Sequence, residues 1–87
     1  MATIEKKIRP EFFETMQSGA KNMEIRIADF RLQPGDTMLL REWDPATKNY
    51  TGRTIEKTVS FVNRVDLDKI GDINELRKHG FYLIELE

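Results

Sequence analysis

Residues 34–65 read PGDTMLLREWDPATKNYTGRTIEKTVSFVNRV, and this stretch decides the class of fold. It begins with the turn residues Pro-Gly-Asp, and residues 37–43 then have the apolar centre of a strand. The turn-rich residues 44–52 separate this strand from a longer one, which we expect over residues 53–65. Apolar and polar residues alternate in that second strand, as they do in a half-buried strand. The stretch therefore predicts two strands and a mainly β domain.

The residues before this stretch predict a strand, a helix and another strand. Residues 3–8 form a candidate first strand, and the proline at position 10 suits the first turn of a helix over residues 10–18. Gly19 ends that helix, because glycine adopts a positive φ at little cost. A short strand follows, and its alternation predicts three core positions, namely Met23, Ile25 and Ile27.

The residues after this stretch predict one short helix and one last strand. Asp72 is placed to cap a helix over residues 72–79, and Gly80 ends it. Residues 81–86 form the final strand. Because one main helix cannot cover both faces of a flat sheet, about five strands should curl into a small barrel. The expected class is α+β, mainly β.

Composition limits the possible functions. The 87 residues suffice for one domain, residues 1–87, and the 39% apolar and 33% charged residues are ordinary for a globular chain. We expect a cytoplasmic protein, since there is no cysteine and no apolar run of signal-peptide or membrane-spanning length. We also expect it to be a monomer. The net charge of −1 means that nucleic-acid binding would have to use a local patch or pocket.

No motif predicts a metal or a cofactor. The one histidine, His79, stands beside a glycine turn and is expected to be a surface residue. Asp66, Asp68 and Asp72 resemble a spaced acidic loop, but they lack the glycine and terminal glutamate of a calcium-binding loop. We therefore expect neither a bound metal nor a cofactor.

Residues 19–26, GAKNMEIR, gather three charged side chains at the junction of the first helix and the next strand. In a strand, Glu24 and Arg26 point to the same side, so a weak exposed ion pair is one interpretation. The other is a cleft, in which Glu24 lowers the cost of partly desolvating Lys21 or Arg26. A lysine held in such a cleft could act as a base or nucleophile. Both interpretations stay open on residue types alone.

Seven blocks of the chain resemble a known family when they are taken in order. They are PEFF (10–13), SGAK (18–21), MEIR (23–26), QPGD (33–36), LLREWDP (39–45), YTGR (50–53) and GFYL (80–83). With these blocks the chain resembles the ASCH domains of the PUA-like superfamily, and within them the bacterial and phage branch DUF3850. The resemblance covers nearly the whole chain, least well at residues 66–79. It implies a small β-barrel with helices packed at its openings.

The resemblance also implies binding of RNA or a nucleotide in a cleft beside the Gly-x-Lys element. Carried over, Lys21, Glu24 and Arg26 line that cleft, and Arg41 lies on a neighbouring strand. The basic side chains would contact phosphate, while Trp43 or Tyr50 would stack on a base.

Two alternatives accompany this expectation. One ASCH branch resembles an amidohydrolase that acts on N4-acetylcytidine with a lysine, a threonine three positions later and a further glutamate. Lys21 matches, but Glu24 stands where the threonine would be, and Glu56 or Glu85 would have to supply the glutamate. Lys21 and Glu24 are thus the candidate catalytic residues. Because the threonine is missing, however, we expect the chain not to be an enzyme. The second alternative is a regulatory domain that binds a protein partner.

Overall fold

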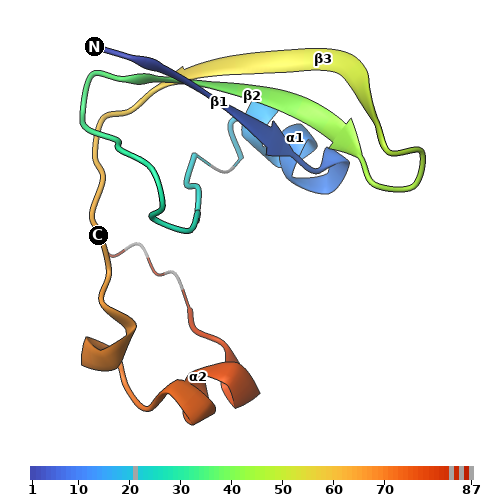
Figure 1. The fold of residues 1–87 in the computed structure, drawn as a ribbon. Helices are drawn as coiled ribbons and strands as arrows, with labels where there is room; N and C mark the ends of the chain where they lie inside the picture. Colours follow the sequence, from blue (N-terminus) through green and yellow to red (C-terminus); the bar gives the residue numbers. More distant parts are fainter. Residues whose placement is uncertain (21, 83, 85, 87) are drawn as a thin grey trace.

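The computed structural model describes residues 1–20, 22–82, 84 and 86. Its centre is a three-stranded sheet in the order β1-β2-β3 (Figure 1), made of β1 (Thr3–Ile8), β2 (Thr37–Asp44) and β3 (Asn49–Thr58). Strand β1 runs parallel to β2, and β3 runs antiparallel to β2. The predicted strands at residues 3–8 and 37–43 are therefore confirmed.

The two predicted helices form where their end signals lie. Helix α1 (Pro10–Gln17) has a proline in its first turn and ends before Gly19, whose φ is 77°. Helix α2 (Ile73–His79) is capped by the Asp72 carboxylate, which accepts a 2.9 Å hydrogen bond from the backbone N–H of Asn74. A short 3-10 helix, η1 (Leu67–Lys69), precedes α2.

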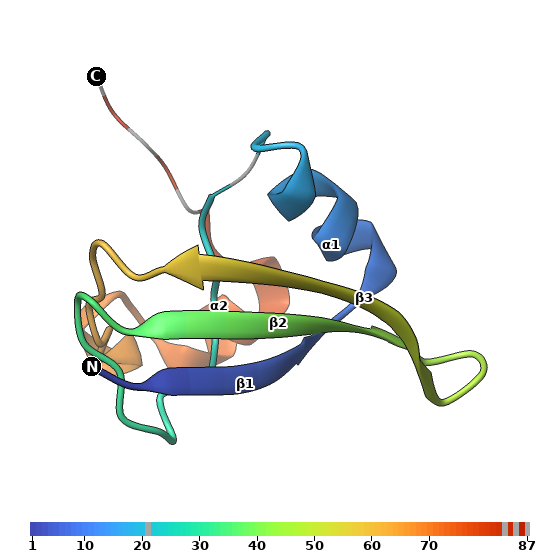
Figure 2. The same ribbon diagram turned by 90° about the horizontal axis from the view of Figure 1, so that it is seen from above.

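The core lies between α1 and one face of the sheet. Helix α1 contributes Phe13, which is completely buried, and Met16. The strands contribute Ile8, Met38 and Leu40. Because residues of a strand alternate between its faces, the neighbours of Met38 and Leu40 in β2 point away from this core. In Figure 2, which views the sheet from above, no described helix lies over that second face.

The hairpin between β2 and β3 is tighter than its sequence suggests. Strand β2 continues to Asp44 and β3 already begins at Asn49, so the prediction of a loop over residues 44–52 was wrong. A turn with Lys48 at a φ of 56° closes the hairpin. The ring of Tyr50 contacts that of Trp43 across the two strands, and this contact stabilises their pairing close to the turn.

The predicted end of β3 at residue 65 was also wrong. Strand β3 stops at Thr58, and residues 59–66 carry no regular structure. The Val59 N–H donates to the Asp36 carbonyl, and the Val59 carbonyl accepts from the Gly35 N–H. These two bonds tie the chain to the start of β2, after which it leaves the sheet. Alternation alone therefore did not locate the end of pairing.

Residues 22–27 form no strand, and their alternation is the reverse of the prediction. Met23, Ile25 and Ile27 are 48%, 61% and 82% exposed, so the prediction that they belong to the core was wrong. The polar residues between them, Glu24 and Arg26, are half-buried instead. An ion pair between these two and a hydrogen bond from Arg26 to β1 turn the polar side of the segment inward.

The predicted last strand is also not seen in the described part of its range. Residues 81, 82, 84 and 86 have no strand structure, and the rest of 81–86 lies outside the described residues. The described residues thus form an open sheet of three strands, and the barrel of about five strands that was expected is not shown among them. The molecule is a small α+β domain in which strands outnumber the two α-helices. Among the described residues, no helix is both long and apolar enough to cross a membrane.

Candidate functional site

Four side chains gather on the sheet face opposite α1. Lys7 and Arg41 are register partners in β1 and β2, and Trp43 and Tyr50 are partners in β2 and β3. Residues 41 and 43 share a face because they are two apart in one strand. We call Lys7, Arg41, Trp43 and Tyr50 the cation–aromatic cluster.

The contacts within the cation–aromatic cluster are close. The Trp43 and Tyr50 rings meet edge to face, with centroids 5.0 Å apart and an interplanar angle of 78°. The Lys7 ammonium lies 3.8 Å from the Trp43 ring centroid and 5.8 Å from that of Tyr50. The Arg41 guanidinium lies 3.7 Å from the Tyr50 centroid. These are attractive cation–π distances, so the four side chains support one another.

The two cations of the cluster differ in their charge partners. Arg41 pairs with the exposed Glu5 at 3.2 Å. Lys7 has no carboxylate within salt-bridge distance among residues 1–20, 22–82, 84 and 86. The Lys7 charge therefore lies beside two aromatic rings and has no ion-pair partner in the part of the chain that the structure describes.

The loop predicted to line a cleft lies along the free edge of β1. Arg26 pairs with Glu24 at 2.7 Å, and its other nitrogen donates a 2.7 Å hydrogen bond to the backbone carbonyl of Lys7. The predicted pairing of Glu24 with Arg26 is thus present. The third predicted residue of this loop, Lys21, lies outside the described residues.

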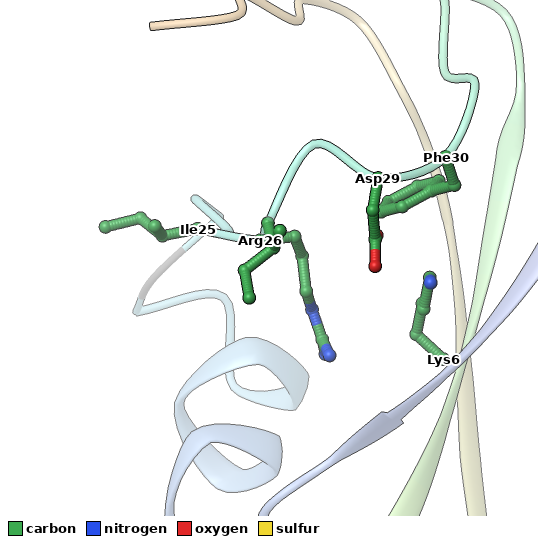
Figure 3. A pocket seen from close by; sticks show the side chains of 6 residues that line it. Lys6, Ile25, Arg26, Asp29 and Phe30 are labelled. Atoms are coloured by element: carbon green, nitrogen blue, oxygen red, sulfur yellow. The ribbon is translucent and has the colours of Figure 1, made fainter. Parts of the chain in front are cut away.

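Two shallow hollows flank Arg26. The larger, of about 320 Å³, is lined by Lys6, Ile25, Arg26, Ile27, Asp29 and Phe30 (Figure 3), and the Lys6 ammonium lies 3.9 Å from the Phe30 ring centroid. The smaller, of about 190 Å³, includes Lys7, Arg9, Phe12, Glu24 and Arg26 in its lining. The predicted site residues thus fall into two groups, Glu24 with Arg26 and Arg41 with Trp43. Lys7 joins them, since its carbonyl binds Arg26 and its ammonium contacts Trp43.

The sequence comparison identifies the family. A family model described as "Domain of unknown function (DUF3850)" matches residues 3–72. The chain belongs to the DUF3850 family. It is also similar to the "Uncharacterized 12.9 kDa protein in GpA 3'region" of Escherichia phage P2, with 35% identity over 63 residues. That alignment covers 71% of this chain and 56% of the phage protein, so the chain spans little more than half of its relative. No solved structure matches significantly.

The matched range of the DUF3850 domain contains the whole cluster and both hollows, whose residues lie between positions 6 and 50. Sequence reasoning missed Lys7, because a single lysine in a short polar strand carries no local signal. Among the described residues of the domain, no three His, Cys, Asp or Glu side chains are placed to hold a metal ion. His79 instead contacts Glu75 at 3.2 Å on the exposed surface of α2.

A buried charged network in the DUF3850 domain was also missed. Glu42 is 2% exposed and accepts hydrogen bonds from Arg53 at 2.6 and 2.8 Å and from the Thr51 hydroxyl at 2.5 Å. Arg53 also donates to Glu14 of α1 at 2.6 Å, so the network links the helix to the sheet. These hydrogen bonds, led by that from Arg53, lower the pKa of Glu42 below its ordinary value. A signal existed, since Glu42 continues the inward phase of Met38 and Leu40.

A second buried carboxylate holds the start of the sheet of the DUF3850 domain. Asp36 accepts hydrogen bonds from the backbone N–H groups of Ala2 at 2.9 Å and Gln33 at 3.1 Å. The bond from Ala2 is the main cause of a lowered pKa for Asp36. The carboxylate thereby fixes both the residue that precedes β1 and the turn before β2.

These two carboxylates predict that the DUF3850 domain loses stability in acid. Because the folded-state pKa of each is lowered, the stabilisation is present above the unfolded pKa and disappears as the pH falls through the folded value. We expect the midpoint of thermal unfolding to fall steadily below about pH 4.5, measured by circular dichroism. In the Asp36→Asn variant, the midpoint of thermal unfolding should fall less with decreasing pH than it does in the parent protein. A midpoint that is constant down to about pH 3 would contradict the prediction.

Proposed function

We propose that this DUF3850 domain binds RNA or a nucleotide through the cation–aromatic cluster and the adjoining Arg26. One observation carries the proposal. Arg41 and Trp43, which the family resemblance implicates, lie together with Lys7 and Tyr50 on a sheet face that no described element covers. Flat rings offer stacking surfaces for bases, and guanidinium or ammonium groups attract phosphate.

Local charge supports the proposal in spite of the net charge of −1. The Lys7 ammonium is not neutralised by a described carboxylate, and the partner of Arg41 is the exposed Glu5. An exposed ion pair contributes little, so a phosphate could replace Glu5 on Arg41 at small cost. The cluster therefore offers positive charge to a ligand where the domain as a whole is nearly neutral.

The proposal includes the fold that the family resemblance implies, which is a PUA-like ASCH barrel. The segments that were expected to supply further strands keep large apolar side chains exposed, including Ile27 at 82%, Phe61 at 80% and Ile84 at 66%. Exposed apolar alternation of this kind suits strands that pair with a free sheet edge. In such a barrel Lys21 would join Glu24 and Arg26 beside the cluster.

The contacts of Glu24 favour binding over amidohydrolase chemistry. Its carboxylate accepts a 2.7 Å charge-assisted hydrogen bond from Arg26. The Arg26 guanidinium thereby occupies an oxygen of the carboxylate that an acid–base residue would turn towards its substrate. Its role here is to hold the Arg26 guanidinium at the edge of β1.

A titration with single-stranded RNA and with nucleotides at low salt tests the proposal. Trp43 is the only tryptophan of the chain, so its fluorescence reports directly on the cluster. We expect binding to change this fluorescence, and Arg41→Ala to weaken binding by roughly tenfold because a charged phosphate contact is lost.

The matched control is Arg77→Ala, which removes the same charge from the exposed surface of α2. It should leave the affinity unchanged. Two results would count against the proposal. One is that no RNA or nucleotide alters the fluorescence at low salt, and the other is that Arg77→Ala weakens binding as much as Arg41→Ala.

A further inference from the structure

The surface around the end of β1 repeats one arrangement three times. In each place an aromatic ring lies next to at least two basic side chains. We call each of these places a station. The first station is the cation–aromatic cluster itself, with Trp43 and Tyr50 beside Lys7 and Arg41. The other two stations are the hollows on either side of Arg26.

The second station is the smaller hollow. Its ring is Phe12, which is 50% exposed although it belongs to α1, and its basic side chains include Arg9 and Arg26. Arg9 pairs with Glu11 at 2.7 Å, and both side chains are more than half exposed. Glu24, the acid that lines this hollow, is already paired with Arg26.

The third station is the larger hollow, which Figure 3 shows from close by. Lys6 reaches towards the Phe30 ring, and Arg26 lines the same hollow. Asp29 is the one acidic residue in its lining. Lys6, like Lys7, has an aromatic ring and no described carboxylate as its partner.

The three stations are contiguous because neighbouring stations share a basic residue. Lys7 contacts Trp43 in the first station and lines the second. Arg26 lines both the second and the third. Each shared residue could contact a phosphate that lies between two successive bases.

We infer that the ligand of this surface is a single-stranded nucleic-acid segment that passes over the edge of β1 through all three stations. The inference rests on the proposed function and extends it. A single strand repeats one phosphate and one flat, unpaired base per nucleotide, which matches the repeated pairing of basic residues with aromatic rings. A mononucleotide would fill one station only, and a duplex would keep its bases stacked away from the rings.

The test compares ligands by fluorescence anisotropy with a labelled single-stranded RNA octamer on the full chain. The competitors are single-stranded DNA of the same sequence, the matching duplex and the four nucleoside monophosphates. The variant Lys6→Gln alters the third station, of which Trp43 is not a part, and Lys69→Gln removes the same charge from the exposed η1 segment. Thermal unfolding checks that both variants are folded.

We expect RNA or DNA single strands to bind at least about tenfold tighter than any monophosphate or the duplex. Lys6→Gln should weaken octamer binding several-fold and lower its salt slope by about one, while Lys69→Gln changes neither. Monophosphates that compete as well as the octamer, a duplex that binds equally well, or identical behaviour of the two lysine variants would overturn the inference and leave the proposed function standing. Failure of every nucleic acid and nucleotide to bind would overturn both.

Discussion

Replacing Phe13 with alanine is expected to leave the domain only marginally stable at room temperature. Phe13 is completely buried between α1 and the sheet, and Arg53 stacks over its ring with the guanidinium 4.6 Å from the centroid. Truncating a buried phenylalanine costs about 3–5 kcal/mol. A domain of this size has a free energy of unfolding near the lower end of about 5–15 kcal/mol. Urea unfolding followed by circular dichroism measures the loss.

Phe12 provides the matched control for this substitution. It neighbours Phe13 in the same helix but is half exposed. Phe12→Ala should change the free energy of unfolding by less than about 1 kcal/mol, because little apolar surface is uncovered. If the two variants were equally stable, the position of α1 against the sheet would be wrong.

Replacing Glu42 with alanine is the second change expected to have a large effect. The substitution leaves Arg53 without its principal partner and Thr51 without an acceptor at the point where α1 meets the hairpin. The buried partner is Glu42, and its removal takes away three hydrogen bonds to a charged group, whereas Arg53 is half exposed and keeps its bond to Glu14. We expect the midpoint of thermal unfolding to fall by more than about 10 °C.

Two further variants isolate the cause of this effect. Glu56→Ala removes an exposed glutamate from β3 and should shift the midpoint little. Replacing Glu42 and Arg53 together by apolar residues should recover part of the loss, since apolar packing then replaces the missing hydrogen bonds, and Glu14, which loses Arg53, is exposed to water. A Glu42→Ala protein that unfolds at the same temperature as the parent would show that the network contributes nothing.

Elements with strong local signals were predictable from the sequence. Helix α1 follows from its proline and from Gly19, and α2 follows from the Asp72 cap and from Gly80. These signals act within a few residues, because each acts on the backbone at the helix end itself: proline removes a free N–H, the Asp72 carboxylate accepts hydrogen bonds, and glycine allows a positive φ. They therefore do not depend on how the rest of the chain packs.

Features set by distant contacts were not predictable in the same way. The alternation of residues 22–27 was recognised, but which phase faces inward depends on the bond from Arg26 to the Lys7 carbonyl, 19 residues away. The end of β3 depends on bonds between Val59 and the turn before β2. Alternation in the sequence cannot decide such matters, since the same pattern suits either face.

The candidate site was predictable only in part. Arg41 came from the resemblance and Trp43 from the stacking chemistry of its ring, and both contact Tyr50. Glu24 and Arg26 followed from strand geometry, and they do pair. Lys7, which joins the two groups, has no sequence motif because its role comes from the parallel pairing of β1 with β2. Glu42 could have been found, since a charged residue in the inward phase of a strand calls for a buried partner.

An NMR titration of the isotope-labelled domain with the single-stranded RNA octamer tests the central claim most directly. The account predicts that the largest chemical-shift changes fall on the backbone amides of Lys7, Arg41 and Tyr50 and on the indole N–H of Trp43. Signals from α2, on the far side of the molecule from these residues, should stay in place. Changes confined to residues 66–80, or an unchanged spectrum at low salt, would contradict it.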